Sequence, residues 1–408
     1  MTREISIIEK LEKDLSLKQL QIRSLLTITQ AINDNVSQDG LFDMYRSFLS
    51  WEMGIEKMAL LVNNDDTWYC ACQINCDDIN VPQLIPHIIT HKRLHTIKSE
   101  DPQEIQDFNI IIPVLHKNYS IAYSIIGGLK EKEDLYNKIQ FITTITNIIS
   151  VAIENKRLFK RQLEQQKFER ELELAKEVQD LLIPEKFGVY KGMELAKIYR
   201  PHLDIGGDYI DFIQYDKDRF ALCIADISGK GVAAALLMAN FQAVVQSLIF
   251  QYRDLETFVY ALNQVVYRIT KGERFITFFV CEFDLKKKNL RYVNAGHFPP
   301  IIINKAREIR RLKSGCTVIG AFDKLPEIKE EQIELKGDEL LLCYTDGLGE
   351  LVNENGEYFE ESHLEKFLDN YTEVSALQFA EKLEHKIDEF SKIEGLKDDI
   401  AVLLCKLV

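Results

Sequence analysis

The sequence predicts an α+β protein in which two domains are joined by a long helix. The chain has 408 residues, enough for two or three ordinary domains. Short apolar runs typical of β-strands recur in both halves, for example Lys57–Val62 and Phe220–Ala225. Between the halves, residues 150–183 contain no Gly or Pro and many Glu, Lys, Gln and Arg residues, which favours one continuous helix.

The order of elements in the N-terminal part indicates a small mixed domain. The first 35 or so residues have apolar groups at helical spacing, and a second helix is expected at Leu41–Trp51. Another helix is expected from Tyr136 onward. The strands expected between these helices are Lys57–Val62, Thr67–Cys70, Asn109–Leu115 and Ser120–Leu129. Over residues 20–157 this order resembles a GAF sensor domain, which implies a ligand site; a dimerisation module without a ligand fits the pattern equally.

The long helix has a mixed seam. Counted in heptads from Val151, both core columns combine apolar with polar residues. The columns are Val151, Leu158, Gln165, Leu172 and Gln179, and Glu154, Arg161, Phe168, Ala175 and Leu182. A dimeric coiled coil balanced between two states and a solvated connecting helix are both compatible with this seam. Pro184 ends the helix, so the predicted domains are 1–155, 156–185 and 186–408.

Composition and charge exclude several classes of function. The formal net charge of −14 argues against a surface that binds nucleic acid or an anionic membrane. The most apolar stretch, Val232–Phe250, contains Asn240, Gln242 and Gln246, so we expect no membrane span. The N-terminus has no signal-peptide core, which indicates a cytoplasmic protein.

The eight cysteines are scattered along the chain, which predicts free thiols in a reducing compartment rather than a disulfide framework. Cys70, Cys72 and Cys76 are close in sequence but lack a usual zinc spacing, so we do not expect a metal there.

In the C-terminal half, acidic residues sit beside glycines and at the ends of apolar runs. An aspartate next to glycine is by itself most often a turn. Here there are four such places, three of them tied to apolar strands. They are Gly206-Gly207-Asp208, Ala225-Asp226-Ile227-Ser228-Gly229, Tyr344-Thr345-Asp346-Gly347 and Asp398-Asp399-Ile400. Carboxylates that converge from separate strand ends are the ligands that Mg²⁺ and Mn²⁺ prefer. Two such ions can lower the pKa of a shared water and clamp a phosphoryl group, so no nucleophilic Ser or Cys is required.

In combination these motifs are specific. The order Gly-Gly-Asp-Tyr-Ile-Asp-Phe, Asp-Ile-Ser-Gly-Lys-Gly, Asn-Ala-Gly-His, Tyr-Thr-Asp-Gly and Asp-Asp-Ile resembles the SpoIIE/RsbU branch of the PPM (PP2C-like) family of metal-dependent protein phosphatases. The resemblance runs from about residue 165 to the C-terminus. It implies an α-β-β-α sandwich with two Mn²⁺ or Mg²⁺ ions at one edge of its two sheets.

Carried over by position, the resemblance implies a role for each aspartate. Asp226 would bridge both metals, with the backbone carbonyl of Ile227 as a further ligand, and Asp208 would serve one metal directly or through water. Through the metal-bound water, Asp226 and Asp208 would be the catalytic residues. Asp346 would serve the other metal together with Asp398.

Several assignments remain open. Asp399 is the alternative to Asp398, which is preferred because the family's aspartate takes the first place of this pair. Asp211 fits a supporting role beside the ligands or a surface turn. Lys230 could approach a phosphate or be a solvated turn lysine. His297 could have a structural hydrogen-bonding role or a catalytic one. The resemblance identifies neither the general acid nor a phosphate-binding arginine.

The implied function is hydrolysis of phosphoserine or phosphothreonine, with a STAS-domain anti-sigma-factor antagonist as the expected substrate. In relatives, the stretch Leu174–Pro184 belongs to a switch that dimerises and controls assembly of the metal site, so we expect a homodimer through this helix. One rival is a non-catalytic dimeric sensor or binding protein that retains the fold. Another is a diguanylate cyclase, suggested by Gly206–Ile210, but it leaves the other aspartates unexplained.

Overall fold

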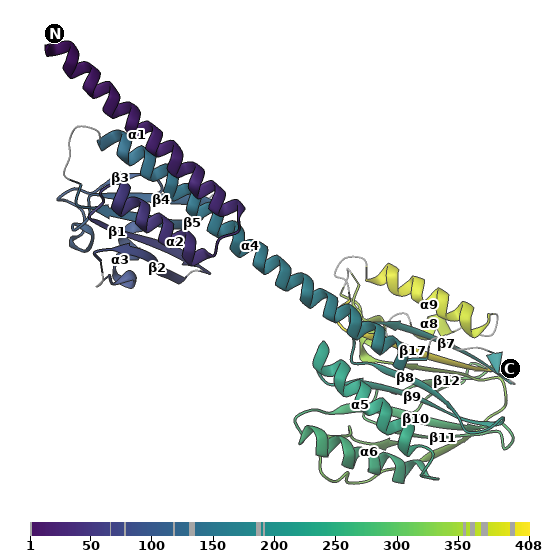
Figure 1. Cartoon of the computed structure of the whole chain (residues 1–408). Helices are drawn as coiled ribbons and strands as arrows, with labels where there is room; N and C mark the ends of the chain where they lie inside the picture. Colours follow the sequence, from purple (N-terminus) through teal and green to yellow (C-terminus); the bar gives the residue numbers. More distant parts are fainter. Residues whose placement is uncertain are drawn as a thin grey trace. The chain divides into compact units, whose positions relative to one another are not determined.

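The chain forms two compact units, Met1–Gln166 and Lys167–Val408 (Figure 1). This computed structural model describes residues 2–65, 67–76, 79–116, 119–129, 135–184, 189–190, 192–353, 356–359, 364–368, 374–391 and 396–408. The domain boundary predicted at residue 186 lies outside the described residues.

The first unit contains a five-stranded antiparallel sheet with strand order β2-β1-β5-β4-β3. A short π-helix, Phe48–Glu52, follows α2, and a 3₁₀ turn, Gln103–Ile105, precedes β4. The elements are α1 (Thr2–Asn33), α2 (Gln38–Ser47), β1 (Lys57–Asn64), β2 (Thr67–Ile74), α3 (Val81–Ile88), β3 (His95–Thr96), β4 (Ile110–His116), β5 (Tyr119–Gly127) and the first part of α4 (Leu135–Leu182).

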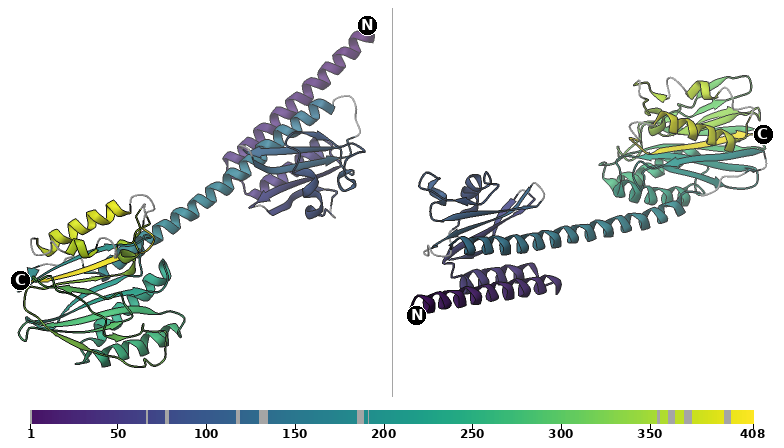
Figure 2. Two further views of the ribbon diagram at one scale, coloured as in Figure 1. Left: turned by 180° about the vertical axis from the view of Figure 1, so that it is seen from behind. Right: turned by 90° about the horizontal axis from the view of Figure 1, so that it is seen from above.

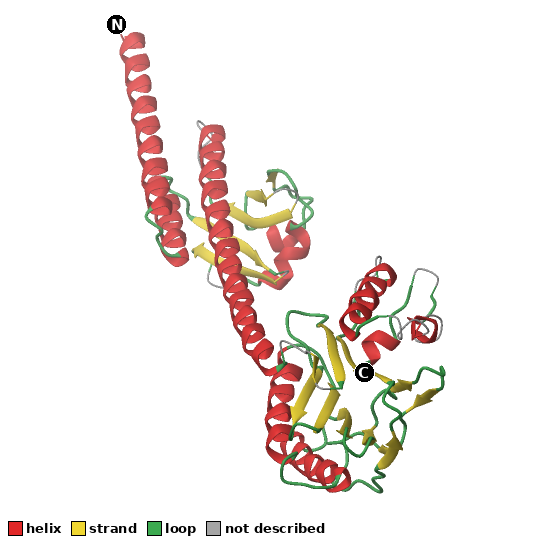
Figure 3. Ribbon diagram, turned by 90° about the vertical axis from the view of Figure 1, so that its right-hand side faces the viewer, coloured by secondary structure: helices red, strands yellow, loops and turns green. Residues whose placement is uncertain are grey.

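Both faces of this sheet are covered. Met58 and Leu60 of β1 belong to a core shared with α1, α2 and α4, whereas Ala59 and Leu61 belong to a core shared with α3 (Figure 3). This division follows from the period of two in a strand. The expected order of helix, antiparallel strands and helix is present, while the GAF resemblance and its ligand stay predictions.

The second unit contains two sheets of six strands. One has the order β14-β11-β10-β9-β8, with β15 paired to β11, and the other has the order β13-β12-β16-β17-β7-β6. The elements after α4 are β6 (Val189–Tyr190), β7 (Met193–Arg200), β8 (Tyr209–Gln214), β9 (Arg219–Ile227), α5 (Val232–Leu248), α6 (Leu255–Thr270), β10 (Ile276–Asp284), β11 (Asn289–Ala295), β12 (Ile301–Ile303), β13 (Ile309–Arg311), β14 (Gly315–Cys316), β15 (Glu331–Glu334), β16 (Leu340–Tyr344), α7 (Asp346–Gly349), α8 (Glu365–Leu368), α9 (Ala376–Phe390) and β17 (Ile400–Leu407).

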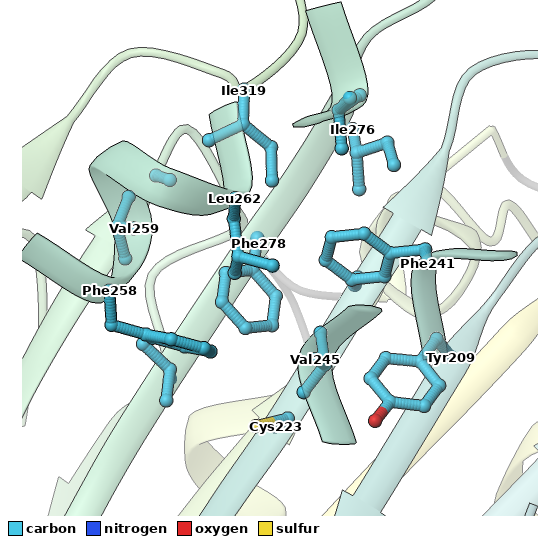
Figure 4. Packing of buried hydrophobic residues seen from close by; sticks show 14 of the residues in the cluster. Tyr209, Cys223, Phe241, Val245, Phe258, Val259, Leu262, Ile276, Phe278 and Ile319 are labelled. Atoms are coloured by element: carbon cyan, nitrogen blue, oxygen red, sulfur yellow. The ribbon is translucent and has the colours of Figure 1, made fainter. Parts of the chain in front are cut away.

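These elements form four layers, as the left view of Figure 2 shows. The helices α5 and α6 cover the sheet of β8–β11, and Figure 4 shows Phe241 of α5 and Phe258 of α6 packed around Phe278 of β10. The helices α7, α8 and α9 cover the other sheet. A separate core joins the inner faces of the two sheets. The predicted α-β-β-α sandwich is therefore confirmed.

Strand alternation decides which side chains enter the space between the sheets. In β9, Ala221 and Cys223 face the helices, whereas Leu222 and Ile224 face the second sheet. The same period predicts that Asp226, two residues after Ile224, points toward the space between the sheets.

All eight cysteines are free, as the sequence predicts. Five of them are buried, namely Cys76, Cys223, Cys281, Cys343 and Cys405. In the described part of the chain, no helix has the length and apolarity needed to cross a membrane.

Candidate active site

The predicted aspartates gather at one edge of the sandwich, where strands of both sheets end. Asp208 directly precedes β8 and Asp226 lies at the end of β9, its antiparallel neighbour. Asp346 follows β16, and the pair Asp398 and Asp399 precedes β17, which pairs with β16. The charge of Asp346 raises the pKa of both Asp208 and Asp226, so aspartates from the two sheets interact electrostatically.

Asp208 is the most enclosed of these carboxylates, with 1% of its surface exposed. The hydroxyl of Thr345 donates to Asp208 Oδ2 at 2.8 Å, and the hydroxyl of Tyr199 donates to the Asp208 carbonyl at 3.1 Å. Burial, followed by the charges of Asp226 and Asp399, raises the pKa of Asp208 well above its ordinary value, and the Thr345 bond opposes that rise.

The pKa values of Asp226 and Asp346 are also raised above the ordinary value of an aspartate. Burial, followed by the charges of Asp346, Asp398 and Asp399, raises the pKa of Asp226 to about 7. Burial and then the charge of Asp398 raise the pKa of Asp346 to about 6. Since like charges at short range disfavour ionisation, a bound cation would relieve this repulsion.

The adjacent aspartates Asp398 and Asp399 have different environments. Asp399 is buried, and its two oxygens accept backbone hydrogen bonds from His202 N at 2.7 Å and Gly207 N at 2.6 Å. Asp398 is 43% exposed at the side chain, and its Oδ2 lies 2.9 Å from the ammonium of Lys230. Asp399 therefore holds the loop before β8 in place, whereas Asp398 forms an ion pair with Lys230.

Close approaches and backbone conformation explain two glycines of the motifs, Gly207 and Gly229. A Cβ on Gly207 would lie 3.1 Å from the carbonyl oxygen of Ile227, the predicted backbone ligand. Gly229 has φ +107, and Arg274, which donates to the Ser228 carbonyl at 2.8 Å, occupies the space where a Cβ would lie. The loop before β8 therefore favours glycine at 207 for its small size, and the turn after Asp226 favours glycine at 229 for its positive φ.

Lys230 belongs to this turn and reaches across to the start of β17. Its ammonium donates to the Lys397 carbonyl at 2.6 Å as well as meeting Asp398. Its side chain is 49% exposed. The charge of Lys230 lowers the pKa of Asp226 and Asp346, so it partly neutralises the acidic cluster.

Asp211 and His297 lie in other surroundings. Asp211 accepts hydrogen bonds from Tyr209 and from Gln246 of α5, which places it on the helix-covered face of β8. His297 is buried, its Nδ1 lies 2.8 Å from Thr277 Oγ1, and its backbone N–H donates to Asn294. Burial lowers the pKa of His297 to about 3, against an opposing backbone hydrogen bond at Tyr344. An imidazole that is neutral at neutral pH is suited to hold structure rather than to donate a proton.

Three residues at the site were not predicted from sequence. They are Thr345 and Tyr199, which contact Asp208, and Gln179, which contacts the preceding loop. Thr345 stands inside a motif next to Asp346, a signal that could have singled it out. Tyr199 and Gln179 lie outside the motifs they contact, 9 and 27 residues before their partners, so no motif singles them out.

The acidic side chains at this edge have the donor type that a divalent cation prefers, but they are not arranged around a common point. Among the described residues, no group of three or more His, Cys, Asp or Glu side chains converges closely enough to hold a metal ion. The donors are nevertheless carboxylates, and their mutual repulsion adds to the effect of burial in raising the pKa values of Asp226 and Asp346. Carboxylates are the ligands that Mg²⁺ and Mn²⁺ prefer, and an exposed side chain such as that of Asp398 can rotate toward a cation.

Comparison with known proteins agrees with the fold. Residues 216–408 match the family model described as Stage II sporulation protein E (SpoIIE). The phosphoserine phosphatase RsbU of Bacillus subtilis (strain 168) is 26% identical over 277 residues, which cover 67% of this chain and 80% of RsbU. The phosphoserine phosphatase RsbP of the same organism is 27% identical over 186 residues, which cover 44% of this chain but only 45% of RsbP.

Among solved structures, the SiaA-PP2C domain of Pseudomonas aeruginosa aligns with a TM-score of 0.54 and 19% sequence identity. The alignment covers 60% of this chain and 99% of that domain. At this identity the likeness concerns the fold, which is that of the α-β-β-α sandwich described above.

Proposed function

We propose that the C-terminal part of this chain, which is similar to the SpoIIE/RsbU type of PPM serine/threonine phosphatases, hydrolyses phosphoserine and phosphothreonine in a protein at its acidic cluster. The observation that carries the proposal is the meeting of carboxylates from both sheets at one edge, with the pKa of Asp226 raised to about 7. Such a cluster is favourable when it binds cations, and a dianionic phosphoryl group needs cations to approach it.

The residues proposed to hold two Mn²⁺ or Mg²⁺ ions are Asp226 with the Ile227 carbonyl, Asp208, Asp346 and Asp398. Such ions, when bound, would lower the pKa of a water and stabilise the charge that develops on the phosphoryl group. The chain itself keeps Asp208 oriented through Thr345 and keeps the loop of Gly207 fixed through Asp399. Asp399 is the weaker ligand candidate, since both of its oxygens already accept backbone hydrogen bonds.

Regulation by the N-terminal unit is the second part of the proposal. We propose a GAF-like sensor at 1–155, a helical switch at 156–185 and a phosphatase domain at 186–408. Apolar side chains that α4 leaves exposed support a homodimer through this helix, among them Phe168, Val178 and Leu181. RsbU and RsbP are named phosphoserine phosphatases, which supports a phosphoprotein substrate, and we propose a STAS-domain protein in the cytoplasm.

Hydrolysis of p-nitrophenyl phosphate and of a phosphoserine peptide, with and without Mn²⁺, tests the activity. The full chain is expected to be active with Mn²⁺, and Asp226→Asn is expected to lose at least about a hundredfold. A wild-type protein without activity, or an Asp226→Asn variant as active as the wild type, would support the non-catalytic binding protein instead. That alternative is favoured by the lack of a closed metal-binding group among the described residues.

Regulation is tested by comparing the full chain with residues 167–408. The cut belongs at 167, because residues 167–182 of α4 are part of the second compact unit. A difference in kcat/KM gives the sign of the regulation, and equal values would contradict it.

A further inference from the structure

Gln179 lies near the end of α4 and differs from its neighbours on the helix. Its side chain is 5% exposed, whereas Val178 and Leu181 are 59% and 81% exposed. A helix that leaves apolar residues in solvent while it buries an amide is not arranged for packing alone. Burial of an amide is unfavourable unless its donor and its acceptor are both satisfied.

Both polar groups of Gln179 are satisfied by one residue. Its Nε2 donates to the Gly206 carbonyl at 2.6 Å, and its Oε1 accepts from Gly206 N at 3.1 Å. The side chain therefore pairs with Gly206 as a neighbouring strand would, across 27 residues of sequence. This double contact fixes both the position and the orientation of the backbone at Gly206.

The next two residues of the loop, Gly207 and Asp208, also form hydrogen bonds at the active site. Gly207 N donates to Asp399 Oδ2, and the Asp208 carbonyl accepts from the hydroxyl of Tyr199. The loop has little freedom at Gly206, where a Cβ would lie 2.8 Å from Asp399 Oδ2 and 3.0 Å from the Tyr199 hydroxyl oxygen. Movement of Gly206 would therefore displace the carboxylate of Asp399 and the backbone that carries Asp208.

We propose that Gln179 is a positioning residue, which holds the Gly206–Asp208 loop so that Asp208 and Asp399 stay in place at the active site. The assignment rests on the proposed phosphatase function for its catalytic consequence. Its structural part, the fixing of the loop by an amide of α4, does not depend on that function.

The test uses the full chain and two substitutions. Gln179→Met keeps the length of the side chain and removes both hydrogen bonds, while Gln179→Glu keeps the acceptor for Gly206 N. Gln166→Met is the matched control, because Gln166 is an exposed glutamine on the same helix. Hydrogen exchange of the peptide that contains Gly206 and Gly207 is measured without metal, and the Mn²⁺ concentration for half-maximal activity is measured with a phosphoserine peptide.

In Gln179→Met, exchange in this peptide should accelerate about tenfold or more, and the Mn²⁺ concentration should rise by a similar factor. KM for the peptide should change less than about twofold, since Gln179 does not face the substrate. Gln179→Glu should accelerate exchange at least as much as Gln179→Met, because its buried carboxylate would face the Gly206 carbonyl and the acidic cluster, and Gln166→Met should match the wild type.

Unchanged exchange of the Gly206 peptide in a folded Gln179→Met protein would overturn the proposal. Acceleration that spreads equally through α5 and α6 would also overturn it, because the residue would then support the fold as a whole. If the wild type has no phosphatase activity, the proposed function fails, while the exchange measurement still decides whether Gln179 positions the loop.

Discussion

The hydroxyl of Thr345 donates a hydrogen bond of 2.8 Å to Oδ2 of Asp208. The hydroxyl oxygen of Thr345 in turn accepts the backbone N–H of Ala401 at 2.9 Å. Thr345 follows β16 and Ala401 lies in β17, so this one hydroxyl connects the second sheet with the acidic residue at the start of β8 in the first. It adds a polar contact between the two sheets, at the active site, to the hydrophobic core that joins them.

Thr345→Val is expected to reduce kcat/KM by about 10- to 100-fold, because a hydrogen bond to a charged group contributes about 1.5–3 kcal/mol. The loss leaves Ala401 N and Asp208 without this partner. The measurement is Mn²⁺-dependent hydrolysis of a phosphoserine peptide. Thr345→Ser keeps the hydroxyl, so its kcat/KM should remain within about threefold of the wild type. Equal losses of kcat/KM in Thr345→Val and Thr345→Ser would contradict the hydrogen-bonding role.

The two adjacent aspartates are expected to respond differently to the same substitution. Asp399→Asn should lower the free energy of unfolding by about 1–3 kcal/mol, because an amide cannot accept from His202 N and Gly207 N with both of its polar atoms. Asp398→Asn should leave unfolding within about 0.5 kcal/mol and weaken Mn²⁺ binding. Urea unfolding without metal and Mn²⁺ titration separate the two, and a reversed pattern would assign the metal ligand to Asp399.

Lys230→Met is expected to decrease the Mn²⁺ concentration needed for half-maximal activity. The ammonium lies 2.9 Å from Asp398 Oδ2, where its charge opposes a second cation. Because both side chains are largely exposed, unfolding should be nearly unchanged. Lys230→Arg keeps the charge and serves as the control. A rise in KM for the phosphopeptide, without a change in the Mn²⁺ requirement, would instead indicate a contact with phosphate.

His297 predicts a pH dependence of stability. Its pKa is lowered to about 3 in the folded protein, against an ordinary value of 6.5, so the unfolded chain binds a proton at higher pH than the folded chain does. The stability that depends on neutral His297 is complete above pH 6.5 and is lost as pH falls, by up to about 1.4 kcal/mol per pH unit.

His297→Gln should remove this contribution. Its free energy of unfolding should therefore fall less steeply than that of the wild type between pH 6.5 and pH 5, whatever the difference at pH 7. Denaturant unfolding at several pH values measures both slopes. Parallel slopes would mean that His297 is not buried as a neutral imidazole.

Much of the second unit could be predicted because several of its strands are marked by local apolar runs in the sequence. The apolar run before Asp226 and the one before Asp346 became β9 and β16, and each aspartate stands where its run ends. Alternation within β8 also separates Asp208 from Asp211, since residues three apart point to opposite faces. The helix-facing position of Asp211 could have been predicted in this way.

Other features depend on contacts between distant segments. The strand period predicts that the side chains of Asp398 and Asp399 point in different directions. It does not predict that Gly207 N and His202 N donate hydrogen bonds to Asp399. Likewise, the heptad count placed Gln179 in a helical seam with Gln165, although only Gln179 is buried. Its partner is a glycine of the active-site loop, which no pattern within the helix can specify.

The free thiols between the two sheets can report how often the sandwich opens. Cys281, Cys343 and Cys405 belong to the core between the two sheets, and burial raises the pKa of each thiol. The thiolate is the form that attacks an alkylating reagent, so these residues can be labelled only when the layers separate. The rate of their modification, compared with that of the half-buried Cys316, would therefore report how often the second unit opens, with native cysteines as the only reporters needed.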